Sequence, residues 1–177
     1  MRNIITLNEL FQFLHTKLPY QQNLVYSIND KGLQVPLSSS NEIYQPNITI
    51  KIEGIEKYSE NIFNMCKEYA NQYNHIGPVT CHAFLANADA PSFDMHTDPD
   101  DVILLCCEGT KTYIVNGDTI ILNKDDHIFI PNGTPHKAIN TNTSLILSFG
   151  LEKYLKDKIH YELDVLPKNN WNVQSQL

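Results

Sequence analysis

The chain has 177 residues, of which 42% are hydrophobic, and this is enough to bury the core of one compact domain without disulfides. A formal net charge of −7 and a pI near 5.4 disfavour nucleic acid as a partner, because a phosphate-binding face needs clustered Lys and Arg. The first residues lack the apolar run of a signal peptide or a membrane span, so we expect a cytoplasmic protein with no membrane partner.

The four cysteines show no CxxC spacing and include the adjacent pair Cys106 and Cys107. Such a pattern suits neither a disulfide framework nor a zinc knuckle. We therefore expect all four thiols to be reduced and mostly buried, in agreement with the predicted compartment.

The first half of the chain mixes helical and strand patterns. Thr6 and Glu9 have capping-box spacing, and apolar residues then recur with helical period up to Pro19, which predicts a short amphipathic helix. Residues 24–37 surround a turn sequence and indicate a hairpin or an irregular edge strand.

Two more elements follow before the composition changes. The alternation of isoleucines at 48, 50 and 52 predicts a half-buried strand. A second helical face then extends from Tyr58 to Tyr73 and closes at Gly77 and Pro78.

From residue 79 onward, short β-rich runs are separated by turns rich in Gly, Asn, Asp and Pro. The runs cover residues 79–86, 102–107, 111–115, 119–122, 127–130, 136–140 and 144–149. This spacing predicts a compact antiparallel barrel or sandwich. We expect a single domain over 1–177, in which 1–78 form a helical and strand elaboration, 79–150 the barrel core, and 151–177 a short helix and a tail.

Three side chains in this region suggest a metal site. His96 and Asp98 are two residues apart, so on a strand they point to the same face. His136 follows the rigid turn at 131–135 and begins a new strand. Each feature alone is common by chance, but their joint occurrence in a predicted barrel favours the two-His-one-carboxylate triad of non-haem Fe(II).

The sequence around His136 resembles the second cupin motif. Pro131-Asn132-Gly133 precedes the His by the expected spacing and Asn140 follows it, although Asp125 replaces the leading Gly. The first cupin motif is only partly present, because HxD replaces HxH and the later ligand Glu is missing. The resemblance implies a mainly β fold, a cupin-type double-stranded β-helix or jelly-roll barrel, with three protein ligands instead of four.

The segment from His96 to Lys111 resembles the JmjC-type oxygenases, and it is similar to the asparaginyl and ribosomal-protein hydroxylases among them. In those enzymes HxD is followed by an apolar strand and then by Gly-x-Lys or Gly-x-Arg, which is Gly109-Thr110-Lys111 here. Their Lys or Arg, thirteen residues after the Asp, binds the distal carboxylate of 2-oxoglutarate. The resemblance, over about residues 79–150, implies Fe(II) on the triad, 2-oxoglutarate at Lys111, and O2.

Four further residues are weaker candidates. Tyr113 shares a face with Lys111 on a regular strand, so its hydroxyl could support the cosubstrate carboxylate or occupy an ordinary core position. Asn140 and Ser148 are candidates for contacts to the cosubstrate or for orienting the metal ligand. For His82, a structural role is the better supported interpretation, with a place at the pocket mouth as the other.

The resemblance implies hydroxylation of a protein or peptide side chain, or of a small amino-acid-like molecule, with release of succinate and CO2. Two alternatives stay open: a metal cupin that works without 2-oxoglutarate, as a small-molecule dioxygenase or isomerase, and a non-catalytic ligand-binding cupin. Lys111 and Asp98 favour the 2-oxoglutarate-dependent oxygenase over the metal cupin that works without 2-oxoglutarate. Segments 20–47 and 86–95 are expected at the pocket rim, and the oligomeric state, a homodimer included, is left open.

Overall fold

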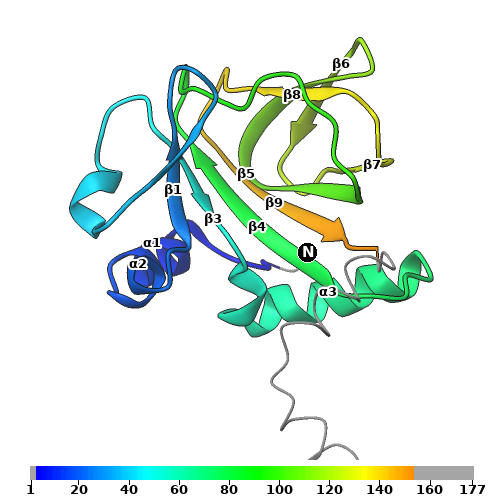
Figure 1. Cartoon of the computed structure of the whole chain (residues 1–177), viewed down its shortest axis with the longest axis horizontal. Coiled ribbons are helices and arrows are strands. Elements are labelled where there is room, and N and C mark those ends of the chain that lie inside the picture. The colour runs from blue at the N-terminus through cyan, green and yellow to red at the C-terminus, as the bar shows by residue number, and fades with distance from the viewer. Residues whose placement is uncertain (1–2, 154–177) are drawn as a thin grey trace, which may run out of the picture.

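A computed structural model describes residues 3–153 and shows a barrel of antiparallel strands with helices packed against one side (Figure 1). The helical elements are α1 (Leu7–Leu14), α2 (Leu18–Gln21), α3 (Glu60–Gln72) and the 3-10 turns η1 (Ser40–Ile43) and η2 (Ile55–Lys57). The strands are β1 (Val25–Ile28), β2 (Gln34–Pro36), β3 (Thr49–Ile52), β4 (Val79–Ala86), β5 (Asp101–Val115), β6 (Asp118–Asn123), β7 (His127–Ile130), β8 (His136–Ile139) and β9 (Ser144–Leu151).

All strands belong to one sheet that folds over on itself. Its order is β2-β1-β3-β4-β9-β5-β6, and β7 and β8 also pair with β5. The predicted hairpin over 24–37 and the predicted strand at 48–52 therefore extend the same sheet, since β3 pairs directly with β4. The mainly β fold with N-terminal helices, as predicted, is confirmed.

Strand β5 is longer than the sequence pattern suggested. Two separate runs, at 102–107 and 111–115, were predicted, but the structure has one continuous strand of 15 residues. A bulge between Cys106 and Glu108 shifts its register. The first half of β5 pairs with β7 and β9, and the second half pairs with β6 and β8, so this one strand closes the barrel.

Alternation along β4 and β9 separates a helix-covered core from the side chains that face the inside of the barrel. Cys81, Ala83 and Leu85 of β4 belong to the core that α1 and α3 cover. On β9, Leu145, Leu147 and Phe149 do the same. Their neighbours at even positions face the inside of the barrel, as the two-residue period of a strand requires.

The helices differ from the prediction at their ends. The first helix stops at Leu14 and does not reach Pro19, because Pro19 begins the separate helix α2 in one of its first two positions. The predicted capping box at Thr6 and Glu9 is present. The expected closing helix after Leu151 lies largely outside the described residues, and Leu151 itself ends strand β9.

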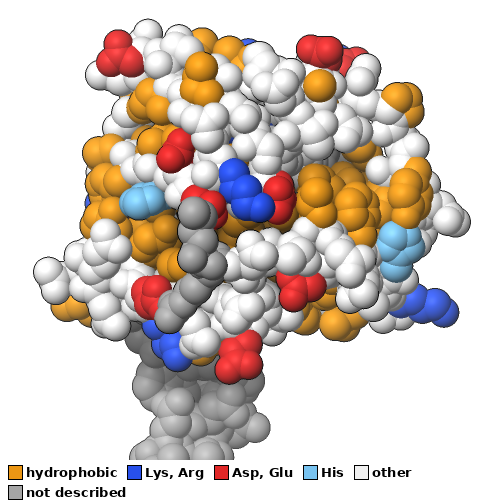
Figure 2. All heavy atoms as spheres, turned by 180° about the vertical axis from the view of Figure 1, so that it is seen from behind, with side chains coloured by type: hydrophobic (Ala, Val, Ile, Leu, Met, Phe, Trp, Pro, Cys, Tyr) orange, Lys and Arg blue, Asp and Glu red, His pale blue; other side chains and the backbone are white. Residues whose placement is uncertain are grey.

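The face behind the view of Figure 1 carries dispersed charges. Lys side chains there are separate from one another and lie among Asp and Glu, so they form no continuous basic stripe on that face (Figure 2). A stripe of that kind is what tracks a phosphate backbone. That nucleic acid is an unlikely partner stays a prediction.

In the described part of the chain, no helix combines the length and the apolar character needed to cross a bilayer.

Leu147 on β9 offers a test of this packing, because its side chain is fully buried between neighbouring strands. Leu147→Ala is expected to lower the free energy of unfolding by about 2–5 kcal/mol, from lost burial and the cavity left behind. Leu33→Ala, at a side chain that is 58% exposed, is the matched control and should change it by less than about 0.5 kcal/mol. Urea denaturation of both variants measures the difference, and equal losses would contradict this description of the core.

Candidate metal centre

A backbone bridge joins the two predicted histidine ligands. His96 and His136 form an isolated antiparallel pair in which each N–H donates to the other's carbonyl oxygen, at 3.1 and 2.9 Å. Side chains of residues directly opposite each other on such a pair point to the same face. The two imidazole rings accordingly lie with their centroids 4.4 Å apart.

Each imidazole is hydrogen-bonded through Nδ1, which leaves Nε2 available to a metal. The Nδ1 of His96 lies 2.7 Å from the carbonyl oxygen of Asp94, and the Nδ1 of His136 lies 3.0 Å from that of Thr134. A carbonyl oxygen only accepts hydrogen bonds, so Nδ1 carries the proton and donates in both rings. This directs Nε2 of each ring into the site, where it can bind a metal once it carries no proton, as is usual for metal-binding histidines.

The carboxylate of Asp98 completes the group. Its Oδ2 lies 3.2 Å from Nε2 of His136, and its Oδ1 lies 3.9 Å from Nε2 of His96. The ligand atoms of the three residues all lie within 4.8 Å of one another. The donors, two neutral imidazoles and one carboxylate, therefore fit a divalent transition metal.

The electrostatics of the cluster are those of a site arranged for a cation. The hydrogen bond from His136 lowers the pKa of the Asp98 carboxyl, so this ligand is ionised at neutral pH. The same hydrogen bond raises the pKa of His136. A metal ion would take the place of the proton that His136 shares with Asp98, because both bind the same lone pair.

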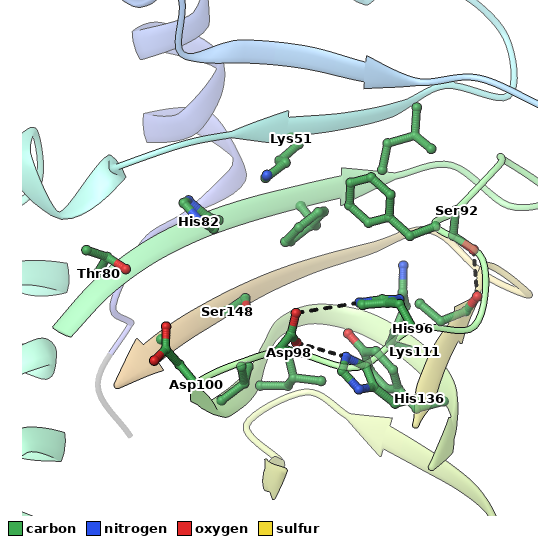
Figure 3. Close-up of a pocket in the computed structure, with 18 of the residues that line it drawn as sticks. Lys51, Thr80, His82, Ser92, His96, Asp98, Asp100, Lys111, His136 and Ser148 are labelled. Atoms are coloured by element: carbon green, nitrogen blue, oxygen red, sulfur yellow. Dashed lines mark hydrogen bonds and ion pairs between the residues drawn. The ribbon is translucent and has the colours of Figure 1, made fainter. Parts of the chain in front are cut away.

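The cluster opens into a cavity of about 290 Å³ inside the barrel (Figure 3). Its other walls come from β3, β4, β5 and β9. Thr80, His82 and Phe84 of β4 line one side, and Ser148 and Gly150 of β9 lie beside them. This is the even-numbered face that strand alternation separates from the helix-covered core.

Lys111 lies in this cavity and is 3% exposed. Burial lowers the pKa of its ammonium to about 8. Among residues 3–153, the hydrogen-bond partner of the ammonium is the side-chain oxygen of Asn140, and no carboxylate lies within ion-pair distance. A buried lysine with a neutral partner alone is costly, so the site is suited to an anionic ligand.

The structure also places the weaker candidates. Tyr113 is buried, lines the cavity, and has its pKa raised by burial. Ser148 and His82 are half-buried cross-strand neighbours on the cavity wall. Burial lowers the pKa of His82, and its Nδ1 accepts a hydrogen bond from the backbone N–H of Gly54. Asn140 is buried and contacts Lys111, with no hydrogen bond to His136.

Two cavity residues on β3 were not predicted. Thr49 and Lys51 both line the cavity, and Lys51 forms an ion pair with Glu53 at 2.9 Å. The signal was present in the sequence, because they alternate with the core isoleucines at 48, 50 and 52, the last two on the same strand, and so must lie on its other face. What could not be known was that β3 pairs with β4 and that this other face is an interior wall.

Comparison with known proteins agrees with the fold. Residues 83–149 match the model of the cupin domain. The structure of YcfD, a ribosomal oxygenase from Escherichia coli, in complex with cobalt and succinic acid superimposes with a TM-score of 0.73 at 13% identity. Its complex with cobalt and 2-oxoglutarate gives 0.71 at 14%. Each match covers 100% of this chain and 50% of the other. No curated protein matches in sequence.

At such identities the likeness establishes the fold, a cupin barrel. The chain spans about half the length of YcfD, so the activity and partners of the larger protein are not transferred by the superposition. The predicted cupin-type fold is confirmed.

Replacing Asp98 tests the metal centre. Asp98→Asn keeps the shape of the side chain but removes its charge. Loss of a residue that only supports a metal ligand can cost roughly 100-fold in affinity, so loss of this ligand charge should weaken Co(II) or Fe(II) binding by at least as much. Asp100→Asn is the matched control, because Asp100 is two residues away and outside the three-residue cluster. Isothermal titration with the metal alone measures both. Wild-type affinity in Asp98→Asn would remove Asp98 from the ligand set.

Proposed function

We propose that this cupin-fold chain is an oxygenase that binds Fe(II) through His96, Asp98 and His136. It would use 2-oxoglutarate and O2 to hydroxylate a protein or peptide side chain, or a small amino-acid-like substrate. The observation that supports this most directly is a buried lysine ammonium, without a carboxylate partner among the described residues, in the same cavity as the His-Asp-His cluster.

The donor set suits Fe(II) because three protein ligands on one face leave adjacent coordination positions for other ligands. With 2-oxoglutarate, bound iron supplies O2 activation, in which the cosubstrate is oxidised to succinate and CO2 and one oxygen atom enters the substrate. The protein's part is to hold and orient. The carbonyl oxygens of Asp94 and Thr134 keep both Nε2 lone pairs directed inward, and the carboxylate of Asp98 offsets part of the metal charge.

Lys111 is the proposed partner of the distal carboxylate of 2-oxoglutarate. In a water-poor cavity an ammonium and a carboxylate attract each other far more strongly than in bulk water. The ligand would thereby compensate the cost of burying the lysine. A metal cupin that works without 2-oxoglutarate needs no such cation, and the alternatives of an isomerase, another dioxygenase or a ligand-binding cupin are correspondingly less well supported.

The size of the cavity limits the substrate. At about 290 Å³ it lies just below the range of about 300–1,000 Å³ that holds drug-sized ligands. Part of that volume would be taken by the cosubstrate. The rest admits one side chain or a small molecule. Apolar side chains of Phe84, Val102 and Leu104 line the walls and would keep water from the reacting groups.

Lys111→Ala tests the cosubstrate assignment. The variant should bind 2-oxoglutarate about 10–100-fold more weakly, the value of one charged hydrogen bond, and should bind the metal as tightly as the wild type. The measurement is an anaerobic titration of the Fe(II) protein with 2-oxoglutarate, followed by the visible charge-transfer band of the complex. Absence of that band at saturating 2-oxoglutarate in the wild type would contradict the proposed function.

Two other lysines sharpen the result. Lys124→Ala removes an exposed lysine that pairs with Glu108 outside the cavity, so it should leave 2-oxoglutarate binding unchanged. Lys51→Ala removes the second lysine of the cavity, which already pairs with Glu53. If Lys51→Ala weakened 2-oxoglutarate binding and Lys111→Ala did not, the carboxylate would belong to Lys51.

A further inference from the structure

Asn140 is the hydrogen-bond partner of the buried Lys111 ammonium, whereas the usual partner of a buried lysine is a carboxylate. Its side chain is 4% exposed, and its Oδ1 accepts a hydrogen bond from the Lys111 ammonium. It stands four residues after His136, where β8 has ended. It therefore links the strand that carries a metal ligand to the cavity's buried cation.

The orientation of this amide is determined by its other contacts. Its Nδ2 donates to the carbonyl oxygens of Ala90 at 2.8 Å and Pro91 at 3.3 Å, and to the hydroxyl oxygen of Thr49 at 3.2 Å. A carbonyl only accepts and an ammonium only donates, so a flipped amide would lose its bonds on both sides. Oδ1 must therefore face Lys111.

The same contacts hold the segment that leads to the first metal ligand. The Thr49 hydroxyl donates to the carbonyl oxygen of Pro91. The backbone N–H of Asp89 donates to the backbone carbonyl oxygen of Asn140. Thr49 is 2% exposed, so these bonds lie away from bulk water. Residues 89–91 are thus fastened to the network a few positions before His96.

We infer that Asn140 is a positioning residue for the cosubstrate cation, with Thr49 and the 90–91 carbonyls fixing its amide. The amide holds the Lys111 ammonium in place without neutralising it, so the positive charge stays available to an incoming carboxylate. An aspartate at this position would pair with Lys111 and compete with the ligand. This inference rests on the proposed function, because it concerns the affinity for 2-oxoglutarate.

Asn140→Asp tests the inference with an almost unchanged side-chain shape. The carboxylate would pair with Lys111, so the affinity for 2-oxoglutarate at pH 7 should fall by about 10-fold or more while metal binding is retained. Thr49→Val is the second variant, in case the first fails to fold. It removes one neutral hydrogen bond to the amide, together with the bond from the hydroxyl to the Pro91 carbonyl, and should cost about 2–10-fold. The measurement is the anaerobic titration of the Fe(II) protein with 2-oxoglutarate.

The pH dependence separates positioning from simple damage. In the wild type, 2-oxoglutarate binding should weaken as pH rises above about 8, where the free Lys111 ammonium loses its proton. Cys106 and Tyr113 are neighbours of Lys111, and burial raises the pKa of both, to about 11 for the thiol, so they stay neutral there. The same cavity is also lined by the titratable side chains of Lys51, His82, His96, Asp98, Asp100, His136 and Glu152. In Asn140→Asp the weakening should begin at higher pH, because the new carboxylate stabilises the protonated lysine.

Ser92→Ala is the matched control. The Ser92 hydroxyl fastens the same segment to the carbonyl oxygen of Ala138 at 2.6 Å and has no hydrogen bond to Lys111 or Asn140. Wild-type affinity in Asn140→Asp, or a loss in Ser92→Ala equal to that in Thr49→Val, would overturn the inference. If Lys111→Ala itself left 2-oxoglutarate binding intact, the cosubstrate role of Lys111 would fail instead, which distinguishes the two proposals.

Discussion

The candidate site depends on the backbone bridge between His96 and His136. This one pair of hydrogen bonds brings together two segments forty residues apart in sequence and places both imidazoles on the same face. The carbonyl oxygens of Asp94 and Thr134 then fix the rings, so the ligand orientation is built into the backbone. The direction of both rings is therefore set by hydrogen bonds to the backbone.

A second constraint is the cost of the buried lysine. The barrel interior removes Lys111 from water and lowers its pKa to about 8, yet its hydrogen-bond partner is neutral. Such an arrangement is stable only if the desolvation penalty is offset by the surrounding fold or by a ligand. The helix-covered core on the other face of β4 and β9 supplies the apolar burial, and the proposed carboxylate ligand supplies the missing charge.

Strand β5 connects these two constraints. It pairs with β9 on both sides of the bulge at Cys106 and Glu108, and its last residues, from Thr112 onward, pair with β8. Lys111 lies one residue before the part of β5 that pairs with β8, the strand that carries His136, and it lines the cavity inside the barrel. The Lys111 ammonium and the metal ligands are therefore brought together by the strand pairing that closes the barrel.

The sequence by itself determined the features that depend on local spacing. The turn before His136 and the period of the β-rich runs follow from neighbouring residues, and the structure has both in a barrel. The strand predicted to carry His96 and Asp98 is wrong: His96 forms an isolated bridge and Asp98 lies in a loop, although the two side chains do meet in one cluster. Only the tertiary structure decided which distant residues meet. Asn140 contacts Thr49 across 91 positions and Lys111 across 29, and β5 is one strand where two were expected. Such contacts depend on strand order and register, which are set by how the whole apolar surface packs.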